Sequence, residues 1–207
     1  MSAEQILVDF VEGKMTIEEF KTIFINNPSI EEFLKDDPNL KKDTYIGDNT
    51  YDFILQEGQD RNGIKNGWQR IGGQLNIHGA ICQHLTRKVI TFTPSNIYSE
   101  KYNLILDTQP SWLDIDEDFF YEEILSKAPQ LKKSELKKWL KNRIKEMFKY
   151  ASTPPRWLQN PEWLIINKKP LTFLCQQNIN NFFHDKATVY VFIDDENGEL
   201  KTVLQVF

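Results

Sequence analysis

The chain has few of the residues on which disulfide-rich and zinc-binding folds depend. Its 207 residues include only two cysteines, Cys82 and Cys175, which lie far apart in the sequence. Two separated cysteines support neither a disulfide framework nor a cysteine-rich zinc site, so we expect both to be buried free thiols. No run approaches the roughly 20 apolar residues that span a bilayer. Residues 1–4 are acidic where a signal peptide is positive. These absences predict a cytoplasmic protein that does not enter a membrane.

Motifs of the common catalytic and nucleotide-binding sites are also missing. The sequence has no Walker loop, dinucleotide-binding glycine pattern, nucleophile elbow or metal-binding histidine pair on a helix. The acidic run Asp114–Asp118 begins like a calcium loop, but Phe119 and Leu125 stand where that loop needs glycine and a bidentate glutamate. We interpret the run as a helix start, where the macrodipole favours carboxylates. The sequence predicts no catalytic residue, metal or cofactor.

Three residues near the middle of the chain have the chemistry of metal ligands or nucleophiles: His78, Cys82 and His84. On a helix, His78 and Cys82 share a face while His84 lies to the side. Structural zinc needs four ligands, and the others would have to come from distant residues such as Cys175 or His184. A Cys/His nucleophile pair would also need an orienting group and an oxyanion site. We favour a buried thiol beside hydrogen-bonded histidines over both sites.

Charge is segregated along the sequence. The net charge is −5, but residues 1–60 contain 14 Asp and Glu against 5 Lys, whereas residues 131–150 contain 8 Lys and Arg against 2 Glu. If the two regions face apart, the resulting dipole steers a charged partner, and if they pack together, the charges pair. We interpret the basic stretch as a solvated helix face, with phosphate binding as the weaker alternative. Trp139 is expected to point into the core and not to stack on bases.

Helix start signals dominate residues 1–40. Three capping-box patterns each precede an apolar stripe: Ser2-x-x-Gln5, Thr16-x-x-Glu19 and Ser29-x-x-Glu32. Pro28 and Pro38 are expected to break the chain between and after these stripes. A small cluster of helices follows from this pattern.

The middle of the chain has weaker signals. We expect a short helix within Tyr45–Gln56 and a longer one at about Trp68–Lys88, interrupted by its glycines, with the Asp60–Gly63 stretch in a loop between them. The β-branched and aromatic stretch Val89–Thr93 predicts a short strand, and Pro94–Ser111 is expected to be irregular. Apolar residues at helical spacing then predict a short helix near Phe119–Leu125, ended by Pro129. The same spacing predicts the longest helix, Ser134–Tyr150.

Three β-prone segments end the chain: Leu171–Gln176, Thr188–Ile193 and Lys201–Phe207. Asn197-Gly198 favours a tight turn between the second and the third, so a three-stranded antiparallel meander is the simplest arrangement. Its apolar face must pack on another element, and the preceding helix is the nearest. The predicted class is α+β, in which a mainly helical region, residues 1–150, packs on a small C-terminal antiparallel sheet. The sheet and a Trp-rich loop occupy residues 151–207, and we expect one compact body.

The segment before these strands, Pro155–Trp163, is the clearest functional feature. It places Trp157 and Trp163 among prolines, next to Arg156, Gln159 and Glu162. Aromatic rings offer a large contact area at low entropic cost, while their N–H groups still need partners. A rigid surface or pocket of this kind indicates recognition and not chemistry. The alternative is that both tryptophans are buried structural residues.

Several stretches resemble bacterial proteins of the polymorphic-toxin immunity kind. The resemblance rests on short aromatic motifs: Gln109-Pro110-Ser111-Trp112-Leu113-Asp114, Leu136-Lys137-Lys138-Trp139-Leu140-Lys141, Pro155-x-Trp157-Leu158-Gln159, Glu162-Trp163, Pro170-Leu171-x-Phe173 and Gln176. The part from Trp157 to Gln205 is also similar to the YwqG-like β family, in which an aromatic loop leads into a strand ending in Gln. The first resemblance implies a small non-catalytic immunity protein that binds a cognate toxin domain and blocks its active site or substrate entry.

No binding residues carry over from such diverse proteins, so the predicted positions come from charge and surface chemistry. An acidic surface on the N-terminal helices would mimic phosphates and steer a basic toxin, and its residues are Glu18, Glu31, Glu32, Asp36 and Asp37. The Trp157 and Trp163 loop would supply aromatic anchors of the interface.

Two alternatives to the immunity role remain. One is a small-ligand-binding protein or enzyme, with a pocket between the Trp loop and the sheet lined by Arg156, Gln159, Glu162 and Gln176. The other is a module that binds nucleic acid or an acidic protein through the lysine-rich helix, for example through Lys137 and Lys141.

Overall fold

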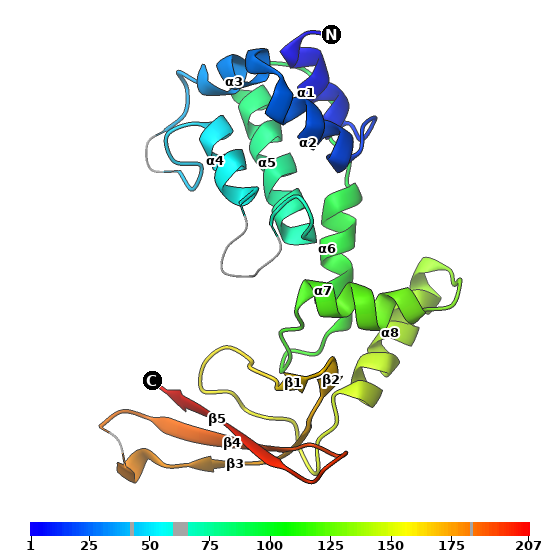
Figure 1. Cartoon of the computed structure of the whole chain (residues 1–207), viewed down its shortest axis with the longest axis vertical. Helices are drawn as coiled ribbons and strands as arrows, with labels where there is room; N and C mark the ends of the chain where they lie inside the picture. Colours follow the sequence, from blue (N-terminus) through cyan, green and yellow to red (C-terminus); the bar gives the residue numbers. More distant parts are fainter. Residues whose placement is uncertain (42–43, 60–65, 183) are drawn as a thin grey trace. The chain divides into compact units, whose positions relative to one another are not determined.

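The computed structural model describes residues 1–41, 44–59, 66–182 and 184–207. Helices form the N-terminal part and strands the C-terminal part, which confirms the predicted α+β class (Figure 1). The chain gathers into two compact units, Met1–Asn103 and Leu104–Phe207, here called unit 1 and unit 2. Secondary structure changes from helix to strand near residue 150, where the sequence placed the border of its two regions. The last long helix, however, belongs to the same unit as the strands.

Unit 1 is built from helices. They are α1 (Ala3–Val11), α2 (Ile17–Asn26), α3 (Pro28–Lys35), α4 (Thr50–Glu57), α5 (Ile71–Arg87) and the first part of α6 (Ile97–Thr108). Helix α5 contacts both α1 and α4 around one apolar core. In that core the rings of Phe10 and Phe20 stack with centroids 4.1 Å apart, and Trp68 contacts Phe20 and Phe24. Aromatic packing therefore joins α1 and α2 to the start of α5.

Two of the three predicted helix starts form. The Ser2 hydroxyl accepts the Gln5 N–H, and α2 has a complete capping box in which Thr16 and Glu19 each cap the other's backbone N–H. The third prediction is wrong, because α3 begins at Pro28, whose N-terminal neighbour Asn27 is the cap. Pro28 starts this helix and does not break the chain, since the first helical residue needs no N–H partner.

The two helices predicted in the middle of unit 1 are confirmed with shifted ends. Helix α4 lies near the end of the predicted 45–56 stretch, and α5 runs without interruption through its glycines. One of them has a steric reason: a Cβ atom on Gly73 would lie 2.2 Å from the Gly67 Cα atom. The predicted loop at Asp60–Gly63 lies outside the described residues.

Both predictions for the connection after α5 are wrong. Val89–Thr93 is not a strand, because the chain here bonds to the end of α1: Thr93 N–H donates to Glu12 Oε1 at 2.9 Å, and Ser95 N–H donates to the Val11 carbonyl at 2.7 Å. Pro94–Ser111 contains α6 where irregular structure was expected. The polar composition of this segment hides a sparse buried stripe, in which Tyr98 and Ile105 are seven residues apart.

Unit 2 combines short helices, one long helix and two small sheets. Its elements are α7 (Glu117–Phe119), η1 (Phe120–Ile124), η2 (Leu125–Lys127), α8 (Lys133–Met147), β1 (Ile165–Ile166), β2 (Lys169–Pro170), β3 (Thr172–Asn178), η3 (Asn180–Phe182), β4 (Ala187–Ile193) and β5 (Leu200–Val206). Both predicted helices of this part form, but α8 ends at Met147 and, with 15 residues, is shorter than the 17-residue α5, so the prediction that it is the longest helix is wrong. Asp116 caps α7 by accepting the Phe119 N–H, which agrees with a helix start at the acidic run. The β1–β2 hairpin was not predicted.

The main sheet has the predicted meander order, β3-β4-β5, with both pairs antiparallel. The turn between β4 and β5 closes through Asp194 N–H, which donates to the Glu199 carbonyl, and Gly198 adopts a φ of 73°. The register of β3 against β4 shifts between Phe173 and Cys175, which marks a bulge. The bulge changes which side chains of β3 face the body of unit 2.

Trp163 packs against both apolar clusters of unit 2. One cluster joins α7, η1 and α8 around Phe120, Ile144 and Phe148, and the other lies on the sheet around Phe173 and Phe192. The indole ring of Trp163 contacts Phe148 on one side and Phe173 and Phe192 on the other. The chain after α8 also bonds to β3, where Phe173 donates to the Lys149 carbonyl. Trp163 and the chain that follows α8 thus connect the helical cluster to the sheet, which the sequence analysis expected to pack directly on this helix.

In unit 1, two glycines of α5 provide a matched test of the close approach between Gly73 and Gly67. Gly73→Ala places a methyl group against the backbone of Gly67, so we expect the free energy of unfolding to fall by about 1–3 kcal/mol. Gly79→Ala meets nothing within 4 Å and removes a flexible residue from a helix interior, so stability should rise by about 0.5–1 kcal/mol. Urea denaturation followed by far-ultraviolet circular dichroism measures both. Equal stability of the two variants would contradict the close approach at Gly67.

Candidate functional site

The Trp loop, Pro155–Trp163, lies along the main sheet. Polar side chains of all three strands hold it there. Gln176 on β3 binds the backbone of Arg156 twice, accepting its N–H at 2.7 Å and donating to its carbonyl. Tyr190 on β4 accepts the Leu158 N–H at 2.6 Å. Gln205 on β5 accepts the N–H groups of Leu158 and Gln159, each at 3.0 Å, and donates to the Asn160 carbonyl. The loop backbone is therefore fixed by side chains and not by a sheet ladder.

Both tryptophans of the loop are half-buried, and their polar atoms are used within unit 2. Trp157 donates its indole N–H to the Trp112 carbonyl at 2.9 Å and lies against the Tyr190 ring, with centroids 4.4 Å apart. Trp163 donates to the Leu171 carbonyl at 2.9 Å. Much of what an indole offers to a partner, its N–H and its ring faces, is thus already used inside the fold. This arrangement supports the alternative in which both tryptophans have a structural role.

The four side chains proposed to line one pocket belong to two separate hollows. Arg156 and Gln176 line a hollow of about 370 Å³ beside the β3 bulge. Gln159 and Glu162 line another, of about 490 Å³, beside the end of β5. The amide of Gln159 also donates to the Val206 carbonyl. Within the described residues, Arg156 and Gln176 therefore share one hollow and Gln159 and Glu162 another, where the prediction had all four in one pocket.

Sequence reasoning missed the residues that hold the loop, Tyr190 and Gln205. Both are buried, and Gln205 lies on the inward face of β5, two residues after Val203. A glutamine at an inward position of an apolar strand is the signal that points to it, since a buried amide needs hydrogen-bond partners. Its partners, however, lie about 46 residues earlier in the sequence.

The five acidic residues predicted on the N-terminal surface have different surroundings. Glu18 and Glu32 are exposed and form no ion pair with a described residue. Glu31 pairs with Lys35 at 2.7 Å within α3, and the exposed Asp36 pairs with Lys88 at 2.5 Å. The prediction of a surface position is wrong for Asp37, because its side chain is only 2% exposed. Four of the five carboxylates, those of Glu18, Glu31, Glu32 and Asp36, therefore reach solvent.

Asp37 is the centre of a buried polar cluster between the end of α3 and the end of α5. Its Oδ2 atom accepts hydrogen bonds from Arg87 at 2.7 Å and lies 3.1 Å from the His84 Nδ1 atom. Burial alone would raise the pKa of Asp37, but the hydrogen bonds and charge of Arg87, with His84, hold the pKa below its ordinary value. Burial lowers the pKa of His84, and Asp37 opposes this only in part. The cluster ties α5 to the chain after α3.

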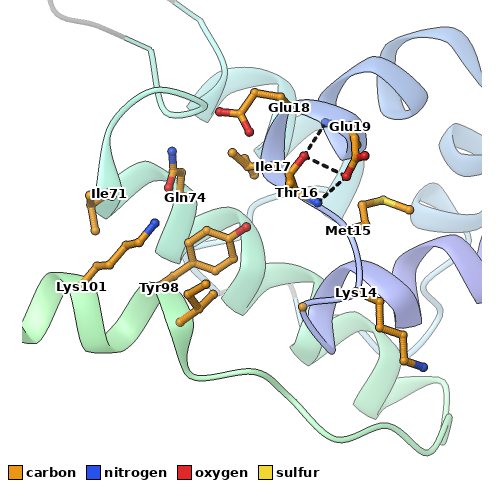
Figure 2. Close-up of a pocket in the computed structure, with 12 residues that line it drawn as sticks. Lys14, Met15, Thr16, Ile17, Glu18, Glu19, Ile71, Gln74, Tyr98 and Lys101 are labelled. Atoms are coloured by element: carbon orange, nitrogen blue, oxygen red, sulfur yellow. Dashed lines mark hydrogen bonds between the residues drawn. The ribbon is translucent and has the colours of Figure 1, made fainter.

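Glu18 stands at the edge of a hollow of about 340 Å³ in unit 1, between the starts of α2, α5 and α6. Figure 2 shows Tyr98 of α6 with its hydroxyl directed toward the start of α2, near Gln74 and Lys101. Met15, Ile17, Ile71 and Ile97 add apolar surface to the lining. Glu19 faces back to Thr16 in the capping box, so its carboxylate is occupied. Burial, and the negative charge of Glu18, raise the pKa of Tyr98 to about 12, so the phenol stays protonated.

The lysine-rich helix is α8. Lys137 pairs with Asp107 at 2.5 Å and Arg143 lies 3.5 Å from Glu146, while Lys138 and Lys141 are exposed. Trp139 is half-buried and packs against the helical cluster of unit 2, as predicted. The polar face therefore combines paired and solvated cations.

The His78, Cys82 and His84 group takes the favoured arrangement in part: both histidines are buried and hydrogen-bonded, while Cys82 is half-buried. His78 Nε2 lies 2.9 Å from the Val11 carbonyl, and the Cys82 sulfur lies 3.8 Å from His78 Nδ1. Burial raises the pKa of Cys82 to about 11, so the thiol is not a nucleophile near neutral pH. Within the described ranges, no three His, Cys, Asp or Glu side chains gather as metal ligands. The prediction that both thiols are buried is wrong for Cys175, which is exposed on β3.

Comparison of the chain with family models, curated proteins and solved structures found no match. Among the residues that the structure describes, no helix is long and apolar enough to cross a membrane.

The position of Trp163 between two clusters predicts a large stability effect. Trp163→Ala should lower the free energy of unfolding by about 3 kcal/mol, because the indole leaves a cavity and the Leu171 carbonyl loses its donor. Phe182→Ala, at an 83% exposed ring of the same unit, serves as the control and should change stability by less than about 0.5 kcal/mol. Urea denaturation measures both. Equal effects would show that Trp163 does not join the clusters.

The buried histidines predict that unit 1 loses stability in mild acid. Burial lowers the pKa of His78 and of His84 in the folded state, so the unfolded chain binds more protons as the pH falls below about 6.5. The free energy of unfolding should therefore decrease between about pH 7 and pH 5. Asp37, whose folded pKa is lowered, adds a further loss only at more acidic pH, as the pH falls through that value.

His78→Gln is the variant that tests this origin, since its amide can still donate to the Val11 carbonyl but does not titrate. It should reduce the pH dependence of unfolding and leave the part that His84 contributes, as measured by urea denaturation at several pH values. His184→Gln changes an exposed ring of unit 2 and should leave the dependence as it is. Identical slopes for the wild type and the His78 variant would disprove the assignment.

Proposed function

We propose that the chain is a non-catalytic protein-binding protein with an immunity role, which binds a cognate toxin domain through the acidic face of α2 and α3. The observation that carries the proposal is the exposure of Glu18 and Glu32 without an ion-pair partner among the described residues. The sequence resemblance to polymorphic-toxin immunity proteins supports the same role. The partner surface that this face fits is basic, as in a toxin that acts on nucleic acid.

Electrostatics gives the face its effect on association. Residues 1–60 carry a sequence net charge of −9, and Asp36 and Glu31 keep their carboxylates near solvent although each has a lysine neighbour. Unpaired surface carboxylates attract a basic partner over about one Debye length, roughly 8–10 Å at physiological salt. Such attraction mainly raises the association rate and falls with ionic strength. Binding should therefore weaken as salt is added.

The hollow beside Glu18 offers the same partner a recess. Its apolar lining, including Met15 and Ile97, suits the stem of a side chain, and Tyr98, which also lines it, carries a hydroxyl that offers a polar contact (Figure 2). Interfaces gain much of their affinity from a few side chains that enter such recesses. Glu18 can therefore attract a basic partner to the same place at which a side chain of that partner can enter the hollow.

Charge reversal tests the proposed face. The Glu18→Lys/Glu32→Lys double variant replaces two exposed residues that make no ion pair with the described chain, so it should fold normally. Tagged protein is used as bait in a lysate of the organism that encodes it, and captured proteins are identified by mass spectrometry. The wild type should retain a stoichiometric partner with a basic domain, and the double variant should lose it.

The matched control changes the charge equally elsewhere. Asp114→Lys/Asp185→Lys also reverses two exposed carboxylates, but in unit 2, and it should retain the partner. The immunity role is then tested by expressing the captured protein in a bacterial host. Growth arrest that the wild type relieves, and the α2–α3 variant does not, is the expected result. A captured protein without toxicity, or one retained by the double variant, would overturn the proposal.

A further inference from the structure

Unit 2 has a second feature that the immunity role does not use, the hollow of about 370 Å³ beside the β3 bulge. Its polar lining comes from the chain after α8, with Ser152, Thr153 and Arg156, and from β3, with Cys175 and Gln176. Leu174 adds half-buried apolar surface. A volume near the lower end of the range for small-molecule sites fits one small organic ligand.

Arg156 is held at this hollow by its backbone and not by its side chain. Its N–H donates to Gln176 Oε1 at 2.7 Å, and its carbonyl accepts from Gln176 Nε2 at 3.3 Å and from the Tyr190 hydroxyl at 3.1 Å. The residue is exposed, and no described side chain forms an ion pair with its guanidinium. Three hydrogen bonds thus fix the base of a side chain whose five donors face solvent.

The lining has one sign of charge. Arg156 is its single charged residue, and all of its residues belong to the described part of the chain. The hydroxyls of Ser152 and Thr153 are additional donors at the same wall. A guanidinium presents its N–H groups as a fork that matches carboxylate and phosphate oxygens, and hydroxyl donors complete the coordination of such anions.

The geometry points to an oxyanion site at which Arg156, with Ser152 and Thr153, binds the carboxylate or phosphate of a small organic ligand whose apolar part lies on Leu174. This site is separate from the acidic face of unit 1 and does not depend on the proposed immunity role. The bulge between Phe173 and Cys175 contributes by shifting the register of β3 at this wall.

Cys175 supplies a direct readout of occupancy, because it lines the hollow and is exposed. Cys82 does not interfere, since burial raises its pKa to about 11. A ligand in the hollow should therefore slow the alkylation of Cys175 by iodoacetamide, a neutral reagent that Arg156 does not attract. The rate is followed by mass spectrometry of the intact chain.

The experiment uses the full chain and three probes: phenyl phosphate, benzoate and inorganic phosphate. Each is titrated against the ¹⁵N-labelled protein by nuclear magnetic resonance, and the Cys175 alkylation rate is measured in parallel. We expect saturable shifts at residues 152–156 and 174–176 and protection of Cys175 by the probe that binds. Phenyl phosphate and benzoate distinguish a phosphate from a carboxylate ligand, and inorganic phosphate shows whether the apolar part contributes.

Two variants assign the effect to Arg156. Arg156→Gln removes the fork but keeps the backbone contacts to Gln176 and Tyr190, and it should weaken binding at least about tenfold, as expected for a lost charge-assisted hydrogen bond. Lys149→Gln removes an equal charge nearby on an exposed residue outside the lining, and it should bind as the wild type does. Absence of saturable binding by all three probes, unchanged binding in the Arg156 variant, or an equal loss in both variants would each overturn the site.

Discussion

The hydrogen bonds that Gln176, Tyr190 and Gln205 make to the Trp loop are the constraint on which unit 2 depends. A buried backbone N–H or carbonyl without a partner costs about as much as a lost hydrogen bond, and within the described residues no strand backbone pairs with residues 155–163. Because the three side chains come from three strands, they face the loop together only when the strands pair in the register seen in the structure. The loop then places Trp157 and Trp163 against the sheet and the helices. Loop, sheet and helical cluster therefore stabilise one another.

This constraint also decides which polar groups remain for recognition. Trp157 packs on the sheet cluster, Trp163 packs on both clusters, and each donates its N–H group within unit 2, so the most conspicuous aromatic feature of the sequence is mainly structural. The groups left without an ion-pair partner in the described chain are less conspicuous, such as Glu18 in unit 1 and the guanidinium of Arg156 in unit 2. Each lies at a hollow whose walls come from separate elements. The two proposed sites have opposite charge, so the ligands proposed for them have opposite sign.

Unit 1 shows how far sequence charge differs from surface charge. Asp36 and Asp37 are adjacent, yet Asp36 is exposed and Asp37 is buried against Arg87 and His84. The end of α3 turns one of them inward, where the low local dielectric strengthens its bonds to Arg87 and makes removal of either partner costly. Counting carboxylates along residues 1–60 therefore overstates the charge that a partner meets. Glu18 and Glu32, by contrast, are exposed, as the sequence predicted.

Local patterns in the sequence were sufficient for much of the fold. The capping box at Thr16 and Glu19, the helical spacing in α8, and the β-prone segments with a glycine turn each depend on neighbours within a few residues, and these elements form where they were predicted. The strand expected at Val89–Thr93 and the irregular structure expected before Ser111 failed, because the partners of these segments lie far away in the sequence. The candidate site was harder still, since the clamp on the loop, the burial of Asp37 and the separation of Arg156 from Glu162 all arise from contacts between distant segments. The sequence alone determined the α+β class, the sheet order and the acidic sign of the first helices, which follow from short-range periodicity and composition. Only the tertiary structure decided which side chains are free, because a polar group is free or used according to what packs beside it.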